Sequence, residues 1–212
     1  IAVILGIVET FLYQKRMPSK DKKFFLATLL KETNKMSDLV NDLLKLAKIE
    51  MEEHITPRNS ISLDKILKQS VTKFLLQAKK RKIKINLTQN QKNIFIKGDE
   101  NQLQQLFDNL IDNSIKYGNL NSKIKININL QKKENKLFVR IDDQSKGIPK
   151  QYLQRITERF YRLDESKKIE GTGLGLSIVK HIVAKHDAEF NIYSTKNIGS
   201  TFELIFPFKS SN

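Results

Sequence analysis

Residues 106–117 read LFDNLIDNSIKY, and with residues 100–105 before them they predict one amphipathic helix. Its apolar residues recur at helical spacing: Leu103, Leu106, Phe107, Leu110, Ile111 and Ile115. Asn109 and Asn113 lie four residues apart and therefore share a second face, with Lys116 three residues further on. Two carboxamides and an ammonium on one face are suited to hold a metal-bound polyphosphate. A surface helix that is merely rich in asparagine would show the same pattern.

Two downstream segments have sequences that suit anion or base recognition. Residues 171–176 read GTGLGL before a predicted helix, so main-chain N–H groups and the positive helix N-terminus could approach an anion. A flexible glycine hinge is the alternative, because the segment fits neither a Rossmann fingerprint nor a Walker A loop. Asp143 ends a predicted strand before a turn with Gly147 and Pro149. Its carboxylate could accept a hydrogen bond from the exocyclic amine of adenine, or it could cap the turn.

The composition is that of a globular protein. Of the 212 residues, 39% are hydrophobic and 29% are charged, which is too apolar for a disordered chain. The absence of cysteine excludes disulfides and thiolate metal sites. The first residues, IAVILGIV, are apolar but too few to span a bilayer, and they lack the basic start and cleavage site of a signal peptide.

The positive charge is concentrated in the middle of the chain. The formal net charge is +15, and residues 57–136 carry 17 basic and 6 acidic side chains. A nucleic-acid-binding surface is one explanation, and a lysine-rich solvated face is the other. The basic segment has few aromatic residues for base stacking and no nucleic-acid-binding motif. We therefore expect no nucleic-acid partner.

The N-terminal part predicts a helical hairpin. One helix begins at Ile1 and is ended by Pro18, and a second runs from Ser19 or Asp21 to about Glu53. Both carry apolar stripes that a single hairpin cannot cover. We therefore expect a homodimer through residues 1–53, with the two hairpins forming a four-helix bundle. A hairpin packed on its own downstream domain is the alternative.

The polar residues from His54 to Ser60 break the helical period and predict a linker, which divides the chain into domains 1–56 and 57–212. The helices expected in the second domain span Leu63–Arg81, Glu100–Tyr117 and Leu174–His186. The expected strands are one at Ile61 and those at Ile83–Leu87, Asn93–Lys97, Lys123–Leu130, Lys136–Asp142, Glu189–Ser194 and Ser200–Pro207. This order predicts an α+β fold, a helical hairpin followed by a two-layer α/β sandwich.

Taken together, these motifs resemble those of sensor histidine kinases. The helix at 100–117 resembles the N box of that family, residues 143–149 the G1 box, and residues 171–176 the G2 box. ERFYR at residues 158–162 resembles the F box, and GSTF at 199–202 resembles the closing strand. Residues 1–53 are similar to the dimerisation and phosphoacceptor hairpin. The resemblance therefore covers essentially the whole chain.

The resemblance implies ATP and Mg²⁺ as cofactors. It makes Asn113 the Mg²⁺ ligand, with Asn109 assisting at the phosphates and Asp143 at the adenine amine. Lys116 and Tyr117 would contact phosphate and ribose, and Arg162 the terminal phosphates. Asn109, Lys116 and Arg162 would be the catalytic residues. The remaining cofactor-binding positions that it implies are Gly147, Gly171, Thr172, Gly173, Leu174, Gly175 and Thr201.

Two departures from the family pattern bear on activity. Ser145 replaces the first glycine of the G1 box, and if that position requires a positive φ the strain would be about 1 kcal/mol. None of His54, His181 and His186 stands in the acceptor motif of the family, which we expect immediately before Ile1. We therefore expect this chain to bind Mg²⁺-ATP without forming phosphohistidine on itself.

The sequence thus predicts a cytoplasmic fragment of a sensor histidine kinase. The whole enzyme would transfer the γ-phosphoryl group of ATP to its histidine and then to an aspartate in the receiver domain of a response regulator. Contact with a membrane would come only through a region before Ile1. One rival is an ATPase of the gyrase or heat-shock chaperone kind, but in that kind a glutamate base stands where this chain has Asn109. The other is a nucleotide-binding pseudokinase without phosphotransfer.

Overall fold

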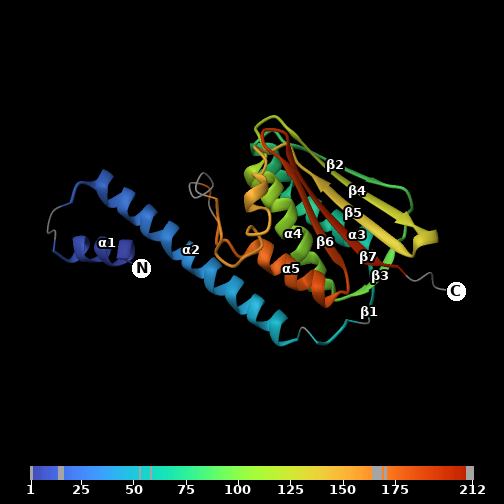
Figure 1. Ribbon diagram of the computed structural model, residues 1–212. Coiled ribbons are helices and arrows are strands. Elements are labelled where there is room, and N and C mark those ends of the chain that lie inside the picture. The colour runs from blue at the N-terminus through green and yellow to red at the C-terminus, as the bar shows by residue number, and fades with distance from the viewer. Residues whose placement is uncertain are drawn as a thin grey trace. The chain divides into compact units, whose positions relative to one another are not determined.

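The computed structural model describes residues 2–13, 17–52, 54–57, 59–163, 169 and 171–208. The chain forms two compact units, Ile1–Lys45 and Leu46–Asn212, whose elements are labelled in Figure 1. The domain boundary at 56/57 remains a proposal. Within the described ranges, no helix is long and apolar enough to cross a bilayer.

The first unit contains the two expected helices, α1 (Ala2–Tyr13) and most of α2 (Ser19–Met51). They contact each other through the rings of Phe11 and Phe25, whose centroids lie 6.3 Å apart. Many of their apolar side chains nevertheless remain exposed. These are Val3, Leu5, Val8, Leu12, Phe24, Leu26, Leu30, Met36, Val40, Leu43 and Leu44. The apolar stripes predicted from the sequence are therefore left largely uncovered within this unit.

The second unit begins with the last turn of α2 and continues as an α+β domain. Its helices are α3 (Leu63–Lys80), α4 (Glu100–Tyr117) and α5 (Gly175–Lys185). Its strands are β1 (Asn59–Ser62), β2 (Lys84–Gln89), β3 (Phe95–Gly98), β4 (Lys123–Gln131), β5 (Lys136–Asp142), β6 (Glu189–Thr195) and β7 (Gly199–Pro207). Short 3₁₀ turns occur at Lys132–Glu134 and Lys150–Tyr152.

Five of the strands form one sheet in the order β2-β4-β5-β7-β6. Only β2 and β4 pair in parallel, and the other neighbours pair antiparallel. β1 and β3 form a separate antiparallel pair. That pairing joins strands more than thirty residues apart, and no local pattern in either strand indicates it.

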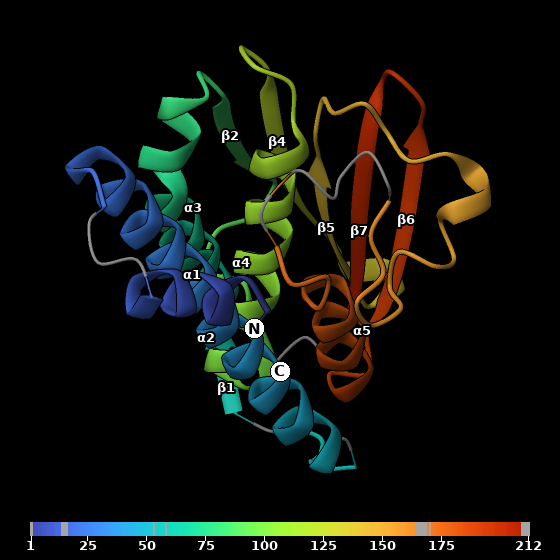
Figure 2. The ribbon, with the colours of Figure 1, turned by 90° about the vertical axis from the view of Figure 1, so that its left-hand side faces the viewer.

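The domain has two layers, because α3, α4 and α5 cover one face of the five-stranded sheet (Figure 2). The alternation of β4 shows how the sequence directs this packing: Ile124, Ile126 and Ile128 are fully buried, while Lys123 and Lys125 on the other face are exposed. Full burial of one such side chain stabilises the fold by about 1.5–3 kcal/mol. The predicted two-layer fold class is confirmed.

The ends of these elements decide where the functional residues stand. α4 begins after Asp99, whose carboxylate accepts a 2.9 Å hydrogen bond from the main-chain N–H of Gln102 and so caps the helix. α4 ends at Tyr117, and Gly118 forms an isolated antiparallel bridge with Ser145 beyond the end of β5. The C-terminal end of α4 and the turn after β5 are therefore neighbours.

Candidate functional site

The asparagine face of α4 lies against the start of α5. A Cβ atom added at Gly175 would lie 3.6 Å from Asn109 Oδ1 and 4.0 Å from Asn113 Nδ2. The Nδ2 atom of Asn109 is buried and has no hydrogen-bond partner among the described residues. A buried donor without a partner costs about 1–3 kcal/mol, so an oxygen acceptor arriving there would be favoured. The structure thus brings the two asparagines and the glycine-rich segment together.

Lys116 and Tyr117 occupy the C-terminal end of the same helix. The ammonium of Lys116 lies 2.6 Å from a carboxylate oxygen of Asp112, one turn earlier. Tyr117 is the last residue of α4 and is partly exposed. Because Lys116 follows Asn113 by three residues, the two side chains lie along one side of the helix. The cation and the amides predicted to contact phosphate therefore form one row.

Asp143 is buried at the end of β5, with 7% of its surface exposed. Its Oδ1 atom accepts two main-chain hydrogen bonds of 3.0 Å, from Ser145 and Ser200. Burial raises the pKa of the Asp143 carboxyl, although its hydrogen bonds to Ser145 and Ser200 act in the opposite direction. The main-chain N–H groups of Ser145 and Ser200 thus fix the orientation of the Asp143 carboxylate at the end of β5.

The turn after Asp143 does not show the backbone strain that a positive φ at Ser145 would cause. The described residues with positive φ include Gly147, at +69°, and do not include Ser145. Ser145 therefore carries no left-handed strain, and its Oγ accepts a 3.1 Å hydrogen bond from the N–H of Gly147. Glycine is needed at 147 instead, since a Cβ there would lie 2.2 Å from the carbonyl oxygen of Thr195.

The F-box segment is hydrogen-bonded to the glycine-rich segment. The N–H of Phe160 donates to the carbonyl of Gly173 at 3.0 Å, and Gly173 has a φ of +76° that suits only glycine. The Arg162 guanidinium donates to the carbonyl of Gly171 at 2.9 Å and also to that of Ile169. Residues 164–168 and 170 lie outside the described residues. Arg162 thus contacts the segment predicted to hold phosphates.

The two neighbours of Gly173 differ in exposure, since Thr172 is partly exposed and Leu174 is buried. Leu174 is fully buried, and its N–H donates to Thr172 Oγ1 at 3.3 Å. This bond closes a compact turn over residues 172–174, immediately before α5. Leu174 would therefore contribute through its main chain, because its side chain belongs to the core.

Thr201 is the predicted site residue that the structure does not bring to the helices. Its Oγ1 donates a 2.5 Å hydrogen bond to Asp142, its partner across the sheet. Ile141 and Phe202 are buried beneath the helices, so the alternation of the strands directs Asp142 and Thr201 to the other face. The preceding residue, Ser200, faces Asp143 instead and was missed, although strand alternation in the sequence could have indicated it.

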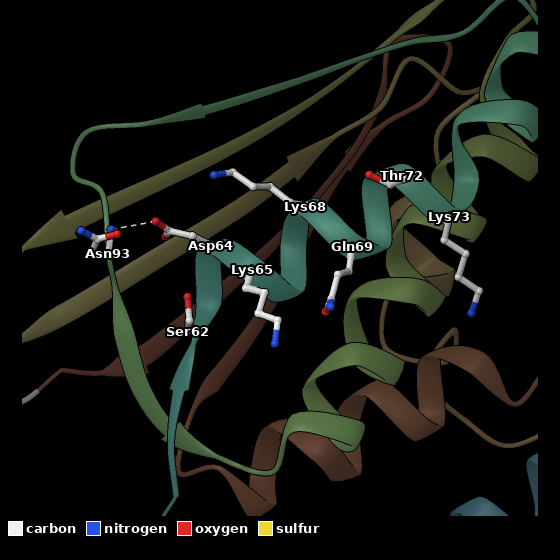
Figure 3. Close-up of a pocket in the computed structure, with 8 residues that line it drawn as sticks. All are labelled: Ser62, Asp64, Lys65, Lys68, Gln69, Thr72, Lys73 and Asn93. Atoms are coloured by element: carbon white, nitrogen blue, oxygen red, sulfur yellow. Dashed lines mark hydrogen bonds between the residues drawn. The ribbon is translucent and has the colours of Figure 1, made fainter.

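A groove on the outer side of α3 is lined by other residues. Figure 3 shows its lining side chains: Ser62, Asp64, Lys65, Lys68, Gln69, Thr72, Lys73 and Asn93. None of the predicted nucleotide residues lines this groove. The site on α4, α5 and the turn after β5 is therefore distinct from it.

The family model described as "Histidine kinase-, DNA gyrase B-, and HSP90-like ATPase" matches residues 98–210, which include α4, the Asp143 turn and α5. The chain belongs to this ATPase family. Two of three similar curated proteins are named as histidine kinases. Sensor histidine kinase WalK of Bacillus subtilis is 29% identical over 87% of this chain, and Drug sensory protein A of Synechocystis is 35% identical over 86%. The sensor-like histidine kinase ycf26 of Pyropia yezoensis is 34% identical over 94%. The chain spans about a third of the length of these relatives, between 29% and 32%.

Solved structures of histidine kinases share the fold. The histidine kinase AdeS of Acinetobacter baumannii aligns over 99% of this chain and 95% of its own, with a TM-score of 0.77 and 19% identity. The catalytic domain of histidine kinase ThkA aligns over 70% of this chain and 94% of its own, with a TM-score of 0.62 and 23% identity.

In this member of the ATPase family, His181 in α5 and His186 at its C-terminal end both contact other parts of the chain. His186 is buried and accepts a 3.1 Å hydrogen bond from the N–H of Asp99, while its other ring nitrogen lies 2.7 Å from the carbonyl of Ile182. Burial lowers the pKa of His186, which keeps the ring neutral. His181 lies 3.1 Å from Glu50, at the end of α2. His186 therefore joins the start of α4 to the end of α5.

Proposed function

We propose that this chain is the nucleotide-binding and catalytic part of a sensor histidine kinase. The meeting of Asn109 and Asn113 with the first residue of α5 supports this proposal more than any other observation. It brings together two motifs that are more than fifty residues apart in the sequence. The names of the curated relatives indicate the same activity.

The residues present fit a magnesium-bound nucleotide. Mg²⁺ prefers oxygen ligands and keeps several waters, so the carboxamide oxygen of Asn113 suffices as a protein ligand, with Asn109 beside it. When bound, the metal ion would neutralise phosphate charge. Asp143 would accept a hydrogen bond from the adenine amine, and Tyr117 would contact the ribose. Lys116 and Arg162 would hold the phosphates.

Further phosphate contacts would come from the main chain between Gly171 and Gly175, at the positive end of α5. Gly147 and Thr172 would shape the two turns that enclose the nucleotide. Thr201 donates to Asp142 on the other face of the sheet, so its predicted contact with the nucleotide is not part of this proposal. The chain would thus act by positioning and by electrostatic stabilisation, which carry most of the catalysis in phosphoryl transfer.

In the whole protein, the γ-phosphoryl group would pass to a histidine and then to an aspartate of a response regulator. One structural neighbour, ThkA, has been solved in complex with the response regulator TrrA, which supports this kind of partner. The proposed activity places this part of the protein in the cytoplasm, where ATP is available. Membrane anchoring would come through another region.

Calorimetric titration tests the proposal. The 212-residue chain should bind ATP in the presence of Mg²⁺ and bind it much more weakly in excess EDTA, since the phosphates would then meet Asn113 without the cation. Duplex DNA at physiological salt should not bind, even though the net charge is +15. Binding of DNA without binding of ATP would overturn the proposal in favour of a basic nucleic-acid module.

The second candidate is an ATPase of the gyrase or chaperone kind, which the family description includes. Asn109 argues against it, because a carboxamide cannot take a proton from water as a general base would. Steady release of phosphate by the chain alone would favour this candidate.

We also predict that residues 1–53 form a homodimer. The reason is the exposed apolar surface of α1 and α2, which includes Leu12 at 72% and Leu30 at 63% exposure. Light scattering should give about twice 24.6 kDa for the full chain, and a chain that begins at Asn59 should be monomeric. A full chain that stays monomeric at high micromolar concentration would contradict this prediction.

A further inference from the structure

α3 and α4 meet in a repeated register. Four polar contacts join residues whose numbers differ by 35: Lys65–Glu100, Lys73–Asp108, Gln77–Asp112 and, from the residue that follows α3, Arg81–Lys116. The partner number rises with the residue number, so the two helices run in the same direction. The contacts recur at multiples of four residues, which is close to one helical turn. Figure 3 shows Lys65 and Lys73 extending from the same side of α3.

The last of these contacts reaches the main chain of the nucleotide site. Arg81 Nη1 donates to the carbonyl of Lys116 at 2.7 Å, and Nη2 donates to the carbonyl of Gly118 at 2.8 Å. Carbonyls in the last turn of a helix have no partner within the helix, so a cation there is favoured. Only arginine has the rigid fork that spans two carbonyls at once.

The preceding contact reaches the side chain of the same lysine. Gln77 Nε2 donates to Asp112 Oδ1 at 3.1 Å, and the other oxygen of Asp112 lies 2.6 Å from Lys116 Nζ. Lys116 is thus held at its main chain by Arg81 and at its ammonium by Asp112. Gln77 lies in the last turn of α3 and Arg81 directly follows it, so both contacts that hold Lys116 depend on this end of α3.

We infer that Arg81 is a positioning residue for the nucleotide site, acting through Lys116. The inference rests on the proposed function, in which Lys116 contacts phosphate. Arg81 itself would not touch the nucleotide, because its guanidinium is committed to the two carbonyls. Without that fork, the last turn of α4 would fray. Binding of a nucleotide would then have to immobilise Lys116, and this entropic cost would lower the affinity.

A double-mutant cycle on the full chain tests this inference. Arg81→Lys should weaken Mg²⁺-ATP binding about 10- to 100-fold, the range seen when outer support of a binding group is lost. In a Lys116→Ala background, the same substitution should have almost no further effect. The exposed neighbour Lys80 supplies the control, and Lys80→Ala should bind ATP like the wild type. If Arg81→Lys does not fold, Arg81→Gln, which keeps one amide donor, enters the same cycle.

The outcomes separate the inference from the proposed function. Failure of the wild-type chain to bind Mg²⁺-ATP would overturn the function and the inference with it. Normal wild-type binding that Lys116→Ala weakens, with Arg81→Lys unchanged, would overturn the inference alone. Losses that add in the double variant would also overturn it, because Arg81 would then support the fold generally rather than act through Lys116.

Discussion

Asn113→Ala is expected to remove Mg²⁺-dependent ATP binding while the domain stays folded. Asn113 is partly exposed on α4, so its loss opens no cavity in the core. Alanine also raises helix propensity, which favours folding. The loss of a metal ligand should lower Mg²⁺-ATP affinity by about 100-fold or more, beyond the usual effect of outer residues. Calorimetric titration with and without Mg²⁺ measures this directly.

The matched control is Asn101→Ala, an exposed asparagine in the first turn of the same helix. It changes helix propensity in the same way and lies at the opposite end of α4 from Asn113, so its ATP affinity should equal that of the wild type. If Asn113→Ala also binds Mg²⁺-ATP normally, Asn113 does not belong to the site.

The second large effect is expected at Asp143. Asp143→Asn keeps an oxygen for the N–H groups of Ser145 and Ser200, but it replaces the second carboxylate oxygen with an amide donor. That donor cannot accept a hydrogen bond from the adenine amine. ATP affinity should fall by 1–3 kcal/mol, or roughly 5- to 150-fold. GTP, which has no amine at that position, should bind weakly to both proteins.

Asp142→Asn is the control for Asp143→Asn, since Asp142 lies next to it on the opposite face of β5. Its ATP affinity should change little. An equal loss of ATP and GTP affinity in Asp143→Asn would mean that Asp143 shapes the turn rather than selecting the base.

The raised pKa of Asp143 adds a pH dependence. A carboxyl whose pKa is higher in the folded than in the unfolded state stabilises the fold below the unfolded value of 3.8, and this contribution is lost as pH rises through the folded pKa. Asp143→Asn, which imitates the protonated form, should therefore melt at a higher temperature than the wild type at neutral pH. This advantage should shrink toward about pH 4. Thermal unfolding across that range is the measurement.

Patterns that depend on neighbouring residues were predicted well from the sequence. The helical period predicted α4, which runs from Glu100 to Tyr117 as expected. The alternation in β4 correctly predicted one buried and one exposed face. Both patterns arise from steric and burial preferences that act within one turn or one strand, so the local sequence contains them.

The tertiary structure alone decided which distant residues meet. The constant register between α3 and α4 depends on how the two helices pack, and nothing near Arg81 in the sequence indicates the carbonyl of Lys116 as its partner. The face of the sheet on which Thr201 lies depends on the pairing register of β7 with β5. A shift of one residue would turn its side chain toward the helices. Ser145 escapes strain because the positive φ of the turn falls at Gly147. The sequence by itself determined the local elements and the family resemblance, whereas long-range packing decided the contacts that hold Lys116 and Asp143 in place.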